Sequence, residues 1–236
     1  MNQQIIEDLV TASHILANEG VLDGLGHVSV RHPNNPQRYL MSRSLAPALV
    51  TSSDIMEYDL DSNAVDRHGR ALFLERFIHG ESYKARPDVM AVIHSHSPTV
   101  IPFSISQTAL QPVFNGAAFL SPSVPVFDIR KVAGMTDLLI GNGELGRALS
   151  VTLGRSAVAL LRGHGNVVVG ETVQQVVYRA IQTELNARLQ LQAAMLQGPL
   201  IYLAPEEATK VNARSGPDAT QIGRTWEVWK RRVLKQ

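Results

Sequence analysis

The sequence predicts an α/β fold in which helices flank a single sheet. Helical and strand-like periodicities alternate along the whole chain, and no internal repeat, low-complexity tract or linker divides it. The length of 236 residues also suits one core, because single cores grow to roughly 250 residues before chains split. We therefore expect one domain over residues 1–236.

The composition indicates no strongly charged partner. The apolar share is 44%, the charged share is 18% and the formal net charge is +1, so no strong field is available to attract nucleic acid or anionic lipid. The basic stretch TWEVWKRRVLKQ at 225–236 alternates apolar and charged residues, which favours a solvated terminal helix. We expect neither nucleic acid nor membrane as a partner.

Two absences restrict the chemistry and the expected location. The chain has no cysteine, which excludes disulfides, thiolate nucleophiles and thiolate ligands, so any metal must be held by nitrogen and oxygen. The stretch MNQQIIEDLV at 1–10 lacks the features of a secretory signal, and no window approaches the roughly 18 apolar residues of a membrane span. We expect a cytoplasmic protein.

The first half of the chain predicts a helix, an antiparallel meander and a second helix. An amphipathic pattern begins at Ile5 and ends at Gly20, a favourable position for a C-terminal glycine. Strand-like segments then lie at 27–31, 38–41, 48–52 and 55–60, separated by turn residues. Helical spacing returns from Glu75 to Arg86, directly before a strand that contains two histidines.

The second half predicts more strands and the longest helix. Strands are expected at 110–114 and 124–129, a helix at 143–154, and a strand, glycine-rich turn and strand at 156–170. Thr172 and Gln175 form a capping-box pattern that begins the longest helix, which runs to Leu196. Pro199 and Pro205 follow its end.

The segment AVIHSHSP at 91–98 points two imidazoles to one side. Side chains at i and i+2 of a strand share a face, so His94 and His96 can ligate the same metal ion. The pair alone does not decide this, because histidine is often a half-buried, hydrogen-bonded residue without a ligand. Paired with one acidic residue it would also suit an iron oxygenase of another fold, although the usual neighbouring carboxylate is missing.

Two further residues favour the metal site. His164 lies between two glycines in LRGHGN at 161–166, where the backbone can approach a ligand closely. Glu75 begins the helix that leads into the histidine strand, so its carboxylate can fold back beside the metal. It would serve there as a fourth ligand, a general base, or both.

These residues together resemble a known family. The resemblance rests on GHVSVR at 26–31, Glu75 with His79, ARPD at 85–88, VIHSH at 92–96 and GHG at 163–165. In this pattern the chain resembles the class II aldolase/adducin family over most of its length. The resemblance implies a three-layer α/β/α sandwich with a mostly antiparallel sheet, and a homotetramer with sites at subunit interfaces. It implies that His94, His96 and His164 bind the metal and that Glu75 is the catalytic carboxylate.

The chain departs from the sugar-phosphate members of the family at the residues that bind phosphate. It has His27 in place of their asparagine, Ser42-Arg43-Ser44 in the turn region, and Phe73-Leu74 in place of two serines before Glu75. Phe and Leu would desolvate a phosphate without compensating it, at a cost of several kcal/mol. We therefore expect a substrate without phosphate, bound by His27, Ser42, Arg43 and Ser44.

The replacements resemble those of the decarboxylase branch, which acts on hydroxylated pyridine or benzene carboxylates. SRSLAP at 42–47, ERFIHGE at 75–81 and PVFNGAAFL at 112–120 carry this resemblance. Arg43 has a guanidinium that matches a planar carboxylate, although an exposed arginine in a turn is an equal alternative. Phe73, Phe77 and Phe114 suit an aromatic ring, but each is explained equally by a core position.

The expected activity is metal-dependent cleavage of a carbon–carbon bond. A divalent metal, Mn²⁺ or Zn²⁺ by resemblance with Fe²⁺ and Co²⁺ left open, would stabilise the enolate or phenolate that forms when a hydroxyaromatic carboxylate or dicarboxylate loses carbon dioxide. Glu75 would carry the proton. His79 lies one helical turn after Glu75, where it can bond Glu75 or the substrate or lie at the surface.

Two other functions stay open at this stage. An aldolase that cleaves a non-phosphorylated hydroxy acid would use the same metal and a similar anion. An adducin-like interaction module would keep the fold without catalysis, but it has no need for three histidines and Glu75 together. The assignment of a small-molecule carboxylate substrate follows from the decarboxylase resemblance.

Overall fold

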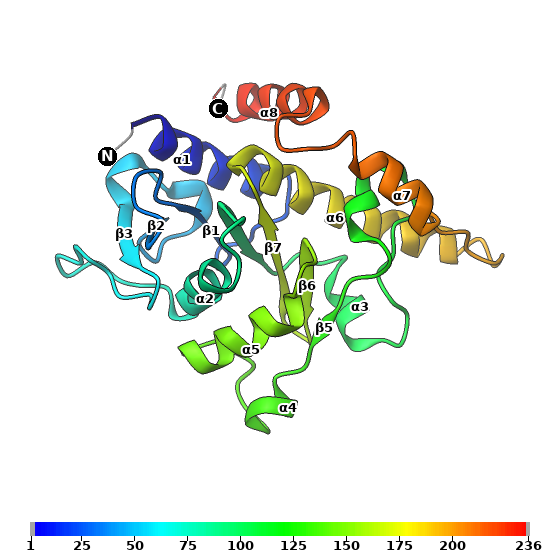
Figure 1. Cartoon of the computed structure of the whole chain (residues 1–236), viewed down its shortest axis with the longest axis horizontal. Helices are drawn as coiled ribbons and strands as arrows, with labels where there is room; N and C mark the ends of the chain where they lie inside the picture. Colours follow the sequence, from blue (N-terminus) through cyan, green and yellow to red (C-terminus); the bar gives the residue numbers. More distant parts are fainter. Residues whose placement is uncertain (1–2, 235–236) are drawn as a thin grey trace.

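The computed structural model describes residues 3–234 and shows a seven-stranded sheet with helices on both faces (Figure 1). The elements of the first half are α1 (Gln3–Asn18), β1 (His27–Arg31), β2 (Arg38–Ser42), η1 (Pro47–Leu49), η2 (Ser52–Asp54), β3 (Ile55–Asp59), η3 (Leu74–Arg76), α2 (Phe77–Ala85) and β4 (Ala91–Ser95). Those of the second half are α3 (Ile101–Ile105), η4 (Asn115–Leu120), β5 (Val126–Phe127), α4 (Arg130–Ala133), α5 (Gly143–Leu153), β6 (Val158–Leu161), β7 (Gly165–Gly170), α6 (Val173–Ala194), α7 (Pro205–Asn212) and α8 (Thr220–Val233).

The sheet is mixed. Its strand order is β3-β2-β1-β4-β7-β6-β5, and five of the six pairings are antiparallel, as far as the described residues go. The exception is β5, which runs parallel to β6 because α4 and α5 form the crossover connection that two parallel strands require. The expected α/β fold is present, but the sheet, predicted to be mostly antiparallel, is mixed.

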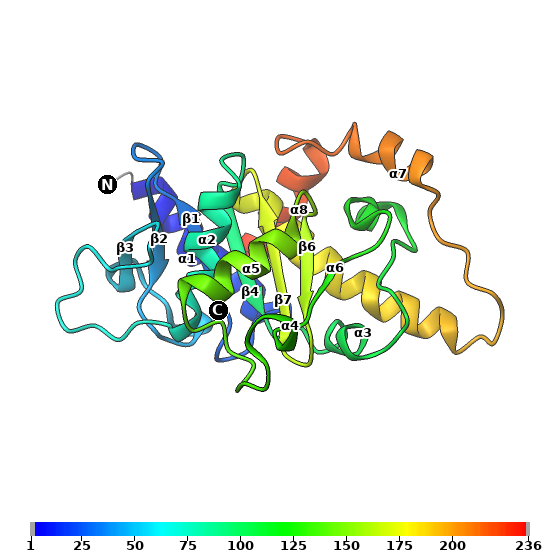
Figure 2. The ribbon, with the colours of Figure 1, turned by 60° about the horizontal axis from the view of Figure 1, so that its bottom comes forward.

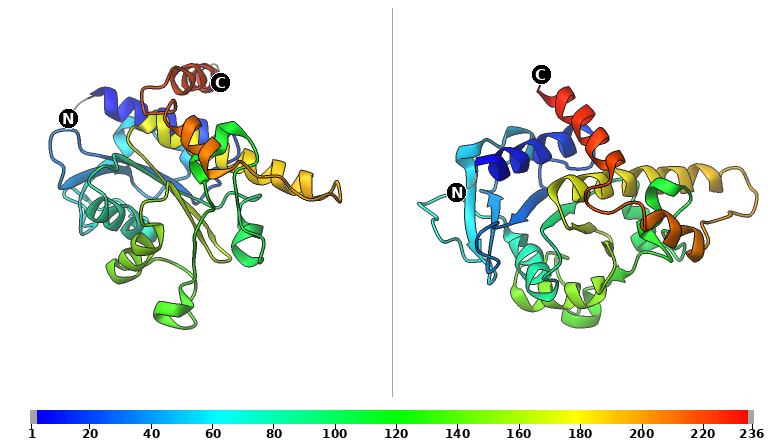
Figure 3. Two further views of the ribbon diagram at one scale, coloured as in Figure 1. Left: turned by 45° about the vertical axis from the view of Figure 1, so that its right-hand side comes forward. Right: turned by 45° about the horizontal axis from the view of Figure 1, so that its top comes forward.

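Side-chain alternation along the strands divides the core between the two faces. On β4, Ile93 packs into a cluster with α1, α6 and α8, whereas Val92 packs into a second cluster with α2 and α5. Figure 2 shows α2 and α5 together on one side of the strands, and the right panel of Figure 3 shows α1, α6 and α8 on the other. Trp226 and Trp229 attach α8 to the side of the sheet that α1 and α6 cover.

The prediction of a strand at 48–52 is wrong, because two short 3₁₀ turns, η1 and η2, lie there and side-chain capping stabilises η2. The Asp54 carboxylate accepts hydrogen bonds from the Thr51 backbone N–H at 2.9 Å and from the Thr51 hydroxyl at 2.7 Å. Local bonds of this kind compete with strand pairing. The meander therefore contains three strands, β1, β2 and β3.

The prediction of a strand at 110–114 is also wrong, because α6 supplies its hydrogen-bond partners. The Asn186 amide accepts from the Val113 N–H at 2.9 Å and donates to the Gln111 carbonyl at 2.8 Å. Gln190 accepts from the Gln111 N–H at 3.1 Å. An extended segment whose backbone is satisfied by side chains has no need of a sheet partner.

Other boundaries shift by a few residues. The strand expected at 124–129 is reduced to β5, the helix expected from Glu75 to Arg86 begins as the 3₁₀ turn η3 before α2, and the longest helix ends at Ala194. The terminal helix is present as α8, while residues 235–236 of the basic stretch lie outside the described residues. Among the described helices, none combines the length and apolar character needed to span a membrane.

Candidate metal centre

His94 lies within β4 and is completely buried, and one of its ring nitrogens has no hydrogen-bond partner within the described residues. Its Nδ1 is 3.2 Å from the carbonyl oxygen of Asn166 on the neighbouring β7. Because a carbonyl only accepts, Nδ1 carries the proton and Nε2 presents a lone pair. Within residues 3–234, this Nε2 is the one fully buried side-chain nitrogen or oxygen without a hydrogen-bond partner. A buried nitrogen lone pair without a partner indicates a ligand site.

His96 and His164 are oriented in the same way. His96 Nδ1 is 3.0 Å from the Asp23 carboxylate, and His164 Nδ1 is 3.1 Å from the Leu138 carbonyl oxygen. Both Nδ1 atoms therefore donate, and the two Nε2 atoms face each other at 3.1 Å. Two lone pairs at this distance repel one another unless a cation or proton lies between them. The geometry thus fits a metal held by neutral imidazoles.

Glu75 completes the cluster from the helical side. It lies in η3, outside helical geometry at φ −88° and ψ 19°, and its Oε1 accepts a hydrogen bond from the Ile140 N–H at 2.9 Å. Its Oε2 is 3.3 Å from Nε2 of both His94 and His164. One ligand atom from each of Glu75, His94, His96 and His164 lies within 4.8 Å of the others. The structure therefore brings together the four residues predicted for the metal and its carboxylate.

The charges of the cluster support each other. Burial by itself would raise the pKa of Glu75, but the facing His164 and His94 imidazoles outweigh burial and lower this pKa. Burial would lower the pKa of His164, and the Glu75 carboxylate outweighs it and raises that pKa. Burial dominates at His96 and lowers its pKa. The carboxylate is therefore anionic and lies among imidazole nitrogens.

Gly163 and Gly165, on either side of His164, are required for different reasons. Gly163 adopts a positive φ of 65°, which glycine enters without a steric penalty. At Gly165 a Cβ would lie 2.1 Å from the Ser95 carbonyl oxygen, so no larger residue fits between β7 and β4. The close approach of these strands places His164 next to His96.

Asp23, Leu138 and Ile140 orient the cluster and were missed by the sequence reasoning. Asp23 also accepts the backbone N–H groups of Leu25 and Gly26 at 2.8 and 2.9 Å, which fixes its carboxylate. An aspartate in a glycine-rich loop was an available signal. Leu138 and Ile140 act through backbone atoms, and no side-chain pattern identifies those.

A pocket of about 460 Å³ opens at the cluster. Its walls combine apolar side chains with the ligand residues, and its lining residues are Asp23, Leu25, His27, Phe73, Leu74, Glu75, His96, Leu139 and His164. The ring of Phe73 lies 4.4 Å from that of His27, measured between centroids. His27 and Phe73 therefore lie at the pocket expected to hold the substrate.

His79 is buried in the α2–sheet interface and not beside Glu75. Its Nε2 is 2.6 Å from His27 Nδ1, and its Nδ1 is 2.6 Å from the Ser29 hydroxyl. Both ring nitrogens are thus engaged, and the hydrogen bond expected between His79 and Glu75 is absent within the described chain. A direct catalytic role for His79 stays a prediction.

The turn Ser42-Arg43-Ser44 does not line this pocket. The Arg43 guanidinium donates through Nε to Asp54 at 2.6 Å, and the backbone N–H groups of Arg43 and Ser44 donate to Asp54 and Ala71. Asp54 therefore occupies the guanidinium as the predicted substrate carboxylate would have done. Substrate contacts from Ser42, Arg43 and Ser44 stay a prediction.

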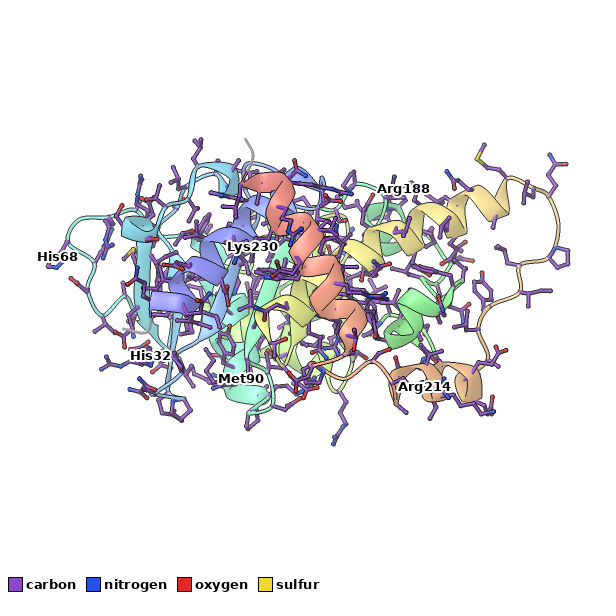
Figure 4. The ribbon with its side chains drawn as sticks, turned by 90° about the horizontal axis from the view of Figure 1, so that it is seen from above. His32, His68, Met90, Arg188, Arg214 and Lys230 are labelled. Carbon is purple, nitrogen blue, oxygen red and sulfur yellow. The ribbon has the colours of Figure 1, made fainter. Side chains whose placement is uncertain are left out.

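The remaining histidines lie elsewhere. His32 and His68 are on loops at one edge of the molecule (Figure 4), and His68 faces Asp66. His14 on α1 bonds the Val50 carbonyl through Nε2 at 2.8 Å. These three side chains have no part in the cluster.

Fold and cluster together define a protein of the class II aldolase type, with a candidate metal centre at one end of the sheet. Consistent with this, the chain belongs to the class II aldolase and adducin family, because residues 7–191 match the model of the Class II Aldolase and Adducin N-terminal domain.

Individual relatives point to one branch of that family. The chain is 38% identical to decarboxylase tropJ of Talaromyces stipitatus, over 97% of this chain and 93% of that protein. It is 30% identical to 3,4-dihydroxyphthalate decarboxylase of Arthrobacter keyseri, over 91% and 89%. The structure of L-fuculose 1-phosphate aldolase from Glaciozyma antarctica superimposes with a TM-score of 0.78 at 26% identity, over 97% of this chain and 89% of that one. The predicted resemblance to the decarboxylase branch is confirmed.

Proposed function

We propose that the protein is a metal-dependent carbon–carbon lyase that decarboxylates a non-phosphorylated hydroxyaromatic carboxylate or dicarboxylate. One observation carries the proposal: three imidazole Nε2 atoms and the Glu75 carboxylate converge at a pocket with apolar walls. The relatives named as decarboxylases support this choice of reaction, and the name of one of them includes a dihydroxylated aromatic diacid.

His94, His96 and His164 would hold the metal, with Mn²⁺ or Zn²⁺ preferred and Fe²⁺ or Co²⁺ also compatible with imidazole donors. The orphaned Nε2 of His94 and the facing Nε2 atoms of His96 and His164 support this fit. A divalent metal bound there supplies a Lewis acid that stabilises negative charge on a substrate oxygen while the carbon–carbon bond breaks.

Glu75 would carry the proton that replaces the lost carboxyl group. Its Oε1 is fixed by the Ile140 N–H, while Oε2 stays at the cluster facing the pocket. One oxygen is therefore held and the other remains available to exchange a proton with a bound substrate. Glu75 has a non-helical backbone within η3, and its Oε2 lies 3.3 Å from Nε2 of His94 on β4.

The pocket walls suit an aromatic ring. Phe73, Leu74, Leu25 and Leu139 line the pocket, and among the described lining residues there is no lysine or arginine to match a phosphate. His27 is the polar side chain next to Phe73, and we propose that it contacts the substrate. Ser42, Arg43 and Ser44 would contribute only to a part of the site that lies outside this pocket.

We further propose that residues 1–236 form one domain that assembles as a cytoplasmic homotetramer with sites at subunit interfaces. The free end of α6 projects from the molecule (Figure 3, left panel), and Met195, Leu196 and Ile201 expose large apolar side chains there. Exposed apolar groups gathered in this way favour contact with another subunit. Light scattering on the purified protein, with a fourfold chain mass expected, tests the assembly.

A parallel assay tests the reaction. The protein, supplied with Mn²⁺ or Zn²⁺, is incubated with hydroxylated benzene and pyridine mono- and dicarboxylates, and released carbon dioxide is measured. The same preparation is incubated with non-phosphorylated hydroxy-keto acids, and pyruvate and aldehyde are measured. Carbon dioxide alone supports the decarboxylase. Aldehyde formation would favour the aldolase, which the fold shared with L-fuculose 1-phosphate aldolase keeps as the second candidate.

A further inference from the structure

A continuous line of hydrogen bonds runs from the pocket into the interface between the sheet and α2. His27 Nδ1 lies 2.6 Å from His79 Nε2, and His79 Nδ1 lies 2.6 Å from Ser29 Oγ. Ser29 Oγ lies 2.7 Å from the Tyr83 hydroxyl. All four side chains are buried. We call these residues, His27, His79, Ser29 and Tyr83, the relay.

The facing ring nitrogens of the two histidines share one proton. At 2.6 Å, one of His27 Nδ1 and His79 Nε2 donates and the other accepts, because two N–H groups cannot face each other at this distance. His79 Nδ1 and the Ser29 hydroxyl are matched in the same way at 2.6 Å. The direction of one bond therefore determines the direction of the others along the relay.

The Tyr83 hydroxyl determines the direction of these hydrogen bonds. Within the described chain, Ser29 Oγ, at 2.7 Å, is the acceptor that the Tyr83 hydroxyl reaches. If Ser29 donated to Tyr83, the buried phenol proton would have no acceptor, which carries a desolvation penalty. Tyr83 therefore donates to Ser29.

The remaining protons follow in sequence. The Ser29 hydroxyl donates to His79 Nδ1, so His79 Nε2 carries the proton and donates to His27 Nδ1. His27 Nε2 then carries a proton as well. Within residues 3–234, His27 Nε2 has no hydrogen-bond partner. It is not fully buried, because His94 Nε2 is the one atom there that is both fully buried and without a partner. His27 lines the pocket, so its Nε2–H opens there.

We propose that Tyr83, Ser29 and His79 are positioning residues that lock His27 as a neutral hydrogen-bond donor to an oxygen of the substrate. This inference rests on the proposed function for the nature of the substrate. It assigns opposite tautomers to two histidines that are direct partners across β1 and β4: His94 carries its proton on Nδ1 and His27 carries its proton on Nε2. A fixed donor selects a substrate with an acceptor oxygen, such as a carboxylate or an ionised hydroxyl, at this point of the ring.

Neutron diffraction on crystals of the full-length deuterated protein reads the tautomers directly. We expect deuterium on Nε2 of both His27 and His79, with none on their Nδ1 atoms, and the Ser29 deuterium directed to His79. Deuterium on Nδ1 of His27 or of His79 would overturn the assignment. This measurement requires no turnover, so it is independent of the reaction proposed above.

Kinetics test whether the relay acts through His27. Ser29→Ala and Tyr83→Phe should each lower kcat/KM about tenfold, as expected for loss of one oriented hydrogen bond. Matched controls exist on the same face: the buried Ser82 hydroxyl bonds only within α2 to Ile78, and the buried Tyr58 hydroxyl bonds Met56. Ser82→Ala and Tyr58→Phe should leave kcat/KM within twofold. Relay variants no slower than these controls would contradict the proposal.

A double-mutant cycle separates positioning from simple structural support. His27→Phe removes the donor, so adding Ser29→Ala to it should cause no further loss of kcat/KM. If Ser29→Ala slows the His27→Phe enzyme tenfold as well, Ser29 acts through packing and the inference fails. The expected deuterium pattern together with no carbon dioxide release from any tested acid would sink the proposed reaction and leave the donor assignment intact.

Discussion

Two groups of histidines lie at the same end of the sheet and differ in what their ring nitrogens face. In the cluster of His94, His96 and His164, each Nδ1 donates to a fixed oxygen and the three Nε2 lone pairs point at one another. In the pair His27 and His79, the facing nitrogens are matched as donor and acceptor. His27 and His94 are even direct neighbours across β1 and β4.

The difference shows that the group hydrogen-bonded to one ring nitrogen determines what the other ring nitrogen of the imidazole can do. A carbonyl or carboxylate that accepts the Nδ1 proton leaves a lone pair on Nε2, which can then ligate a metal. A hydroxyl that donates to Nδ1, as Ser29 does in the relay, leaves a proton at the far nitrogen and prepares a donor. The position of a histidine on a strand is therefore not enough to assign its role.

Removing one ligand should have the largest effect on this comparison. His96→Ala takes away one of three converging lone pairs, and we expect loss of stoichiometric metal and a fall in kcat of about a thousandfold or more. Metal analysis after gel filtration and carbon dioxide release measure these effects. His32→Ala, on the loop after β1 (Figure 4) and outside both the cluster and the pocket lining, is the control that keeps both. A His96→Ala protein with full metal would break the distinction between the two groups.

Glu75→Gln should separate metal binding from turnover. The amide keeps the size of the side chain but cannot carry the proton, so we expect bound metal to remain and kcat to fall by roughly 10²–10⁴-fold. Glu57→Gln on β3, where the carboxylate pairs with Arg38, should change neither quantity. Full activity in Glu75→Gln would remove Glu75 as the proton carrier.

Asp23→Asn should test the group behind His96. The amide oxygen can still accept the Leu25 and Gly26 N–H groups, so the loop is kept, but the negative charge beside His96 Nδ1 is lost. We expect metal affinity to weaken about 10–100-fold, with little change in melting temperature. Competition with a fluorescent chelator gives the Kd. An unchanged Kd would show that the Asp23 carboxylate does not tune His96.

The relay should appear as acid sensitivity of the fold. His79 has a pKa near 3 in the folded chain and an ordinary value of 6.5, so below pH 6.5 the unfolded chain binds a proton that the folded chain does not. The free energy of unfolding therefore falls as pH decreases, by roughly 2 kcal/mol between pH 6.5 and 5 from this group. Urea unfolding of wild type and His79→Asn at both pH values measures it. An equal pH dependence in both proteins would contradict the burial of a neutral His79.

Local patterns were sufficient for the main elements and for the cluster. The i, i+2 spacing of His94 and His96, the glycines around His164 and the position of Glu75 favoured a metal site, and the family resemblance named all four members of the cluster. These residues were predictable because strand alternation and the conformational freedom of glycine are local properties. The strand expected at 48–52 failed because the nearby Asp54 caps a 3₁₀ turn, and the strand expected at 110–114 failed because side-chain amides of the distant α6 bond its backbone.

The sequence by itself determined the family, the alternation of helix and strand, and the four side chains that meet in the cluster. Only the tertiary structure decided what stands behind each imidazole: Asp23 behind His96, the Leu138 carbonyl behind His164, and Ser29 behind His79. The physical reason is that a tautomer depends on partners far apart in the chain, some of them backbone atoms. The residue types along the chain do not predict those contacts.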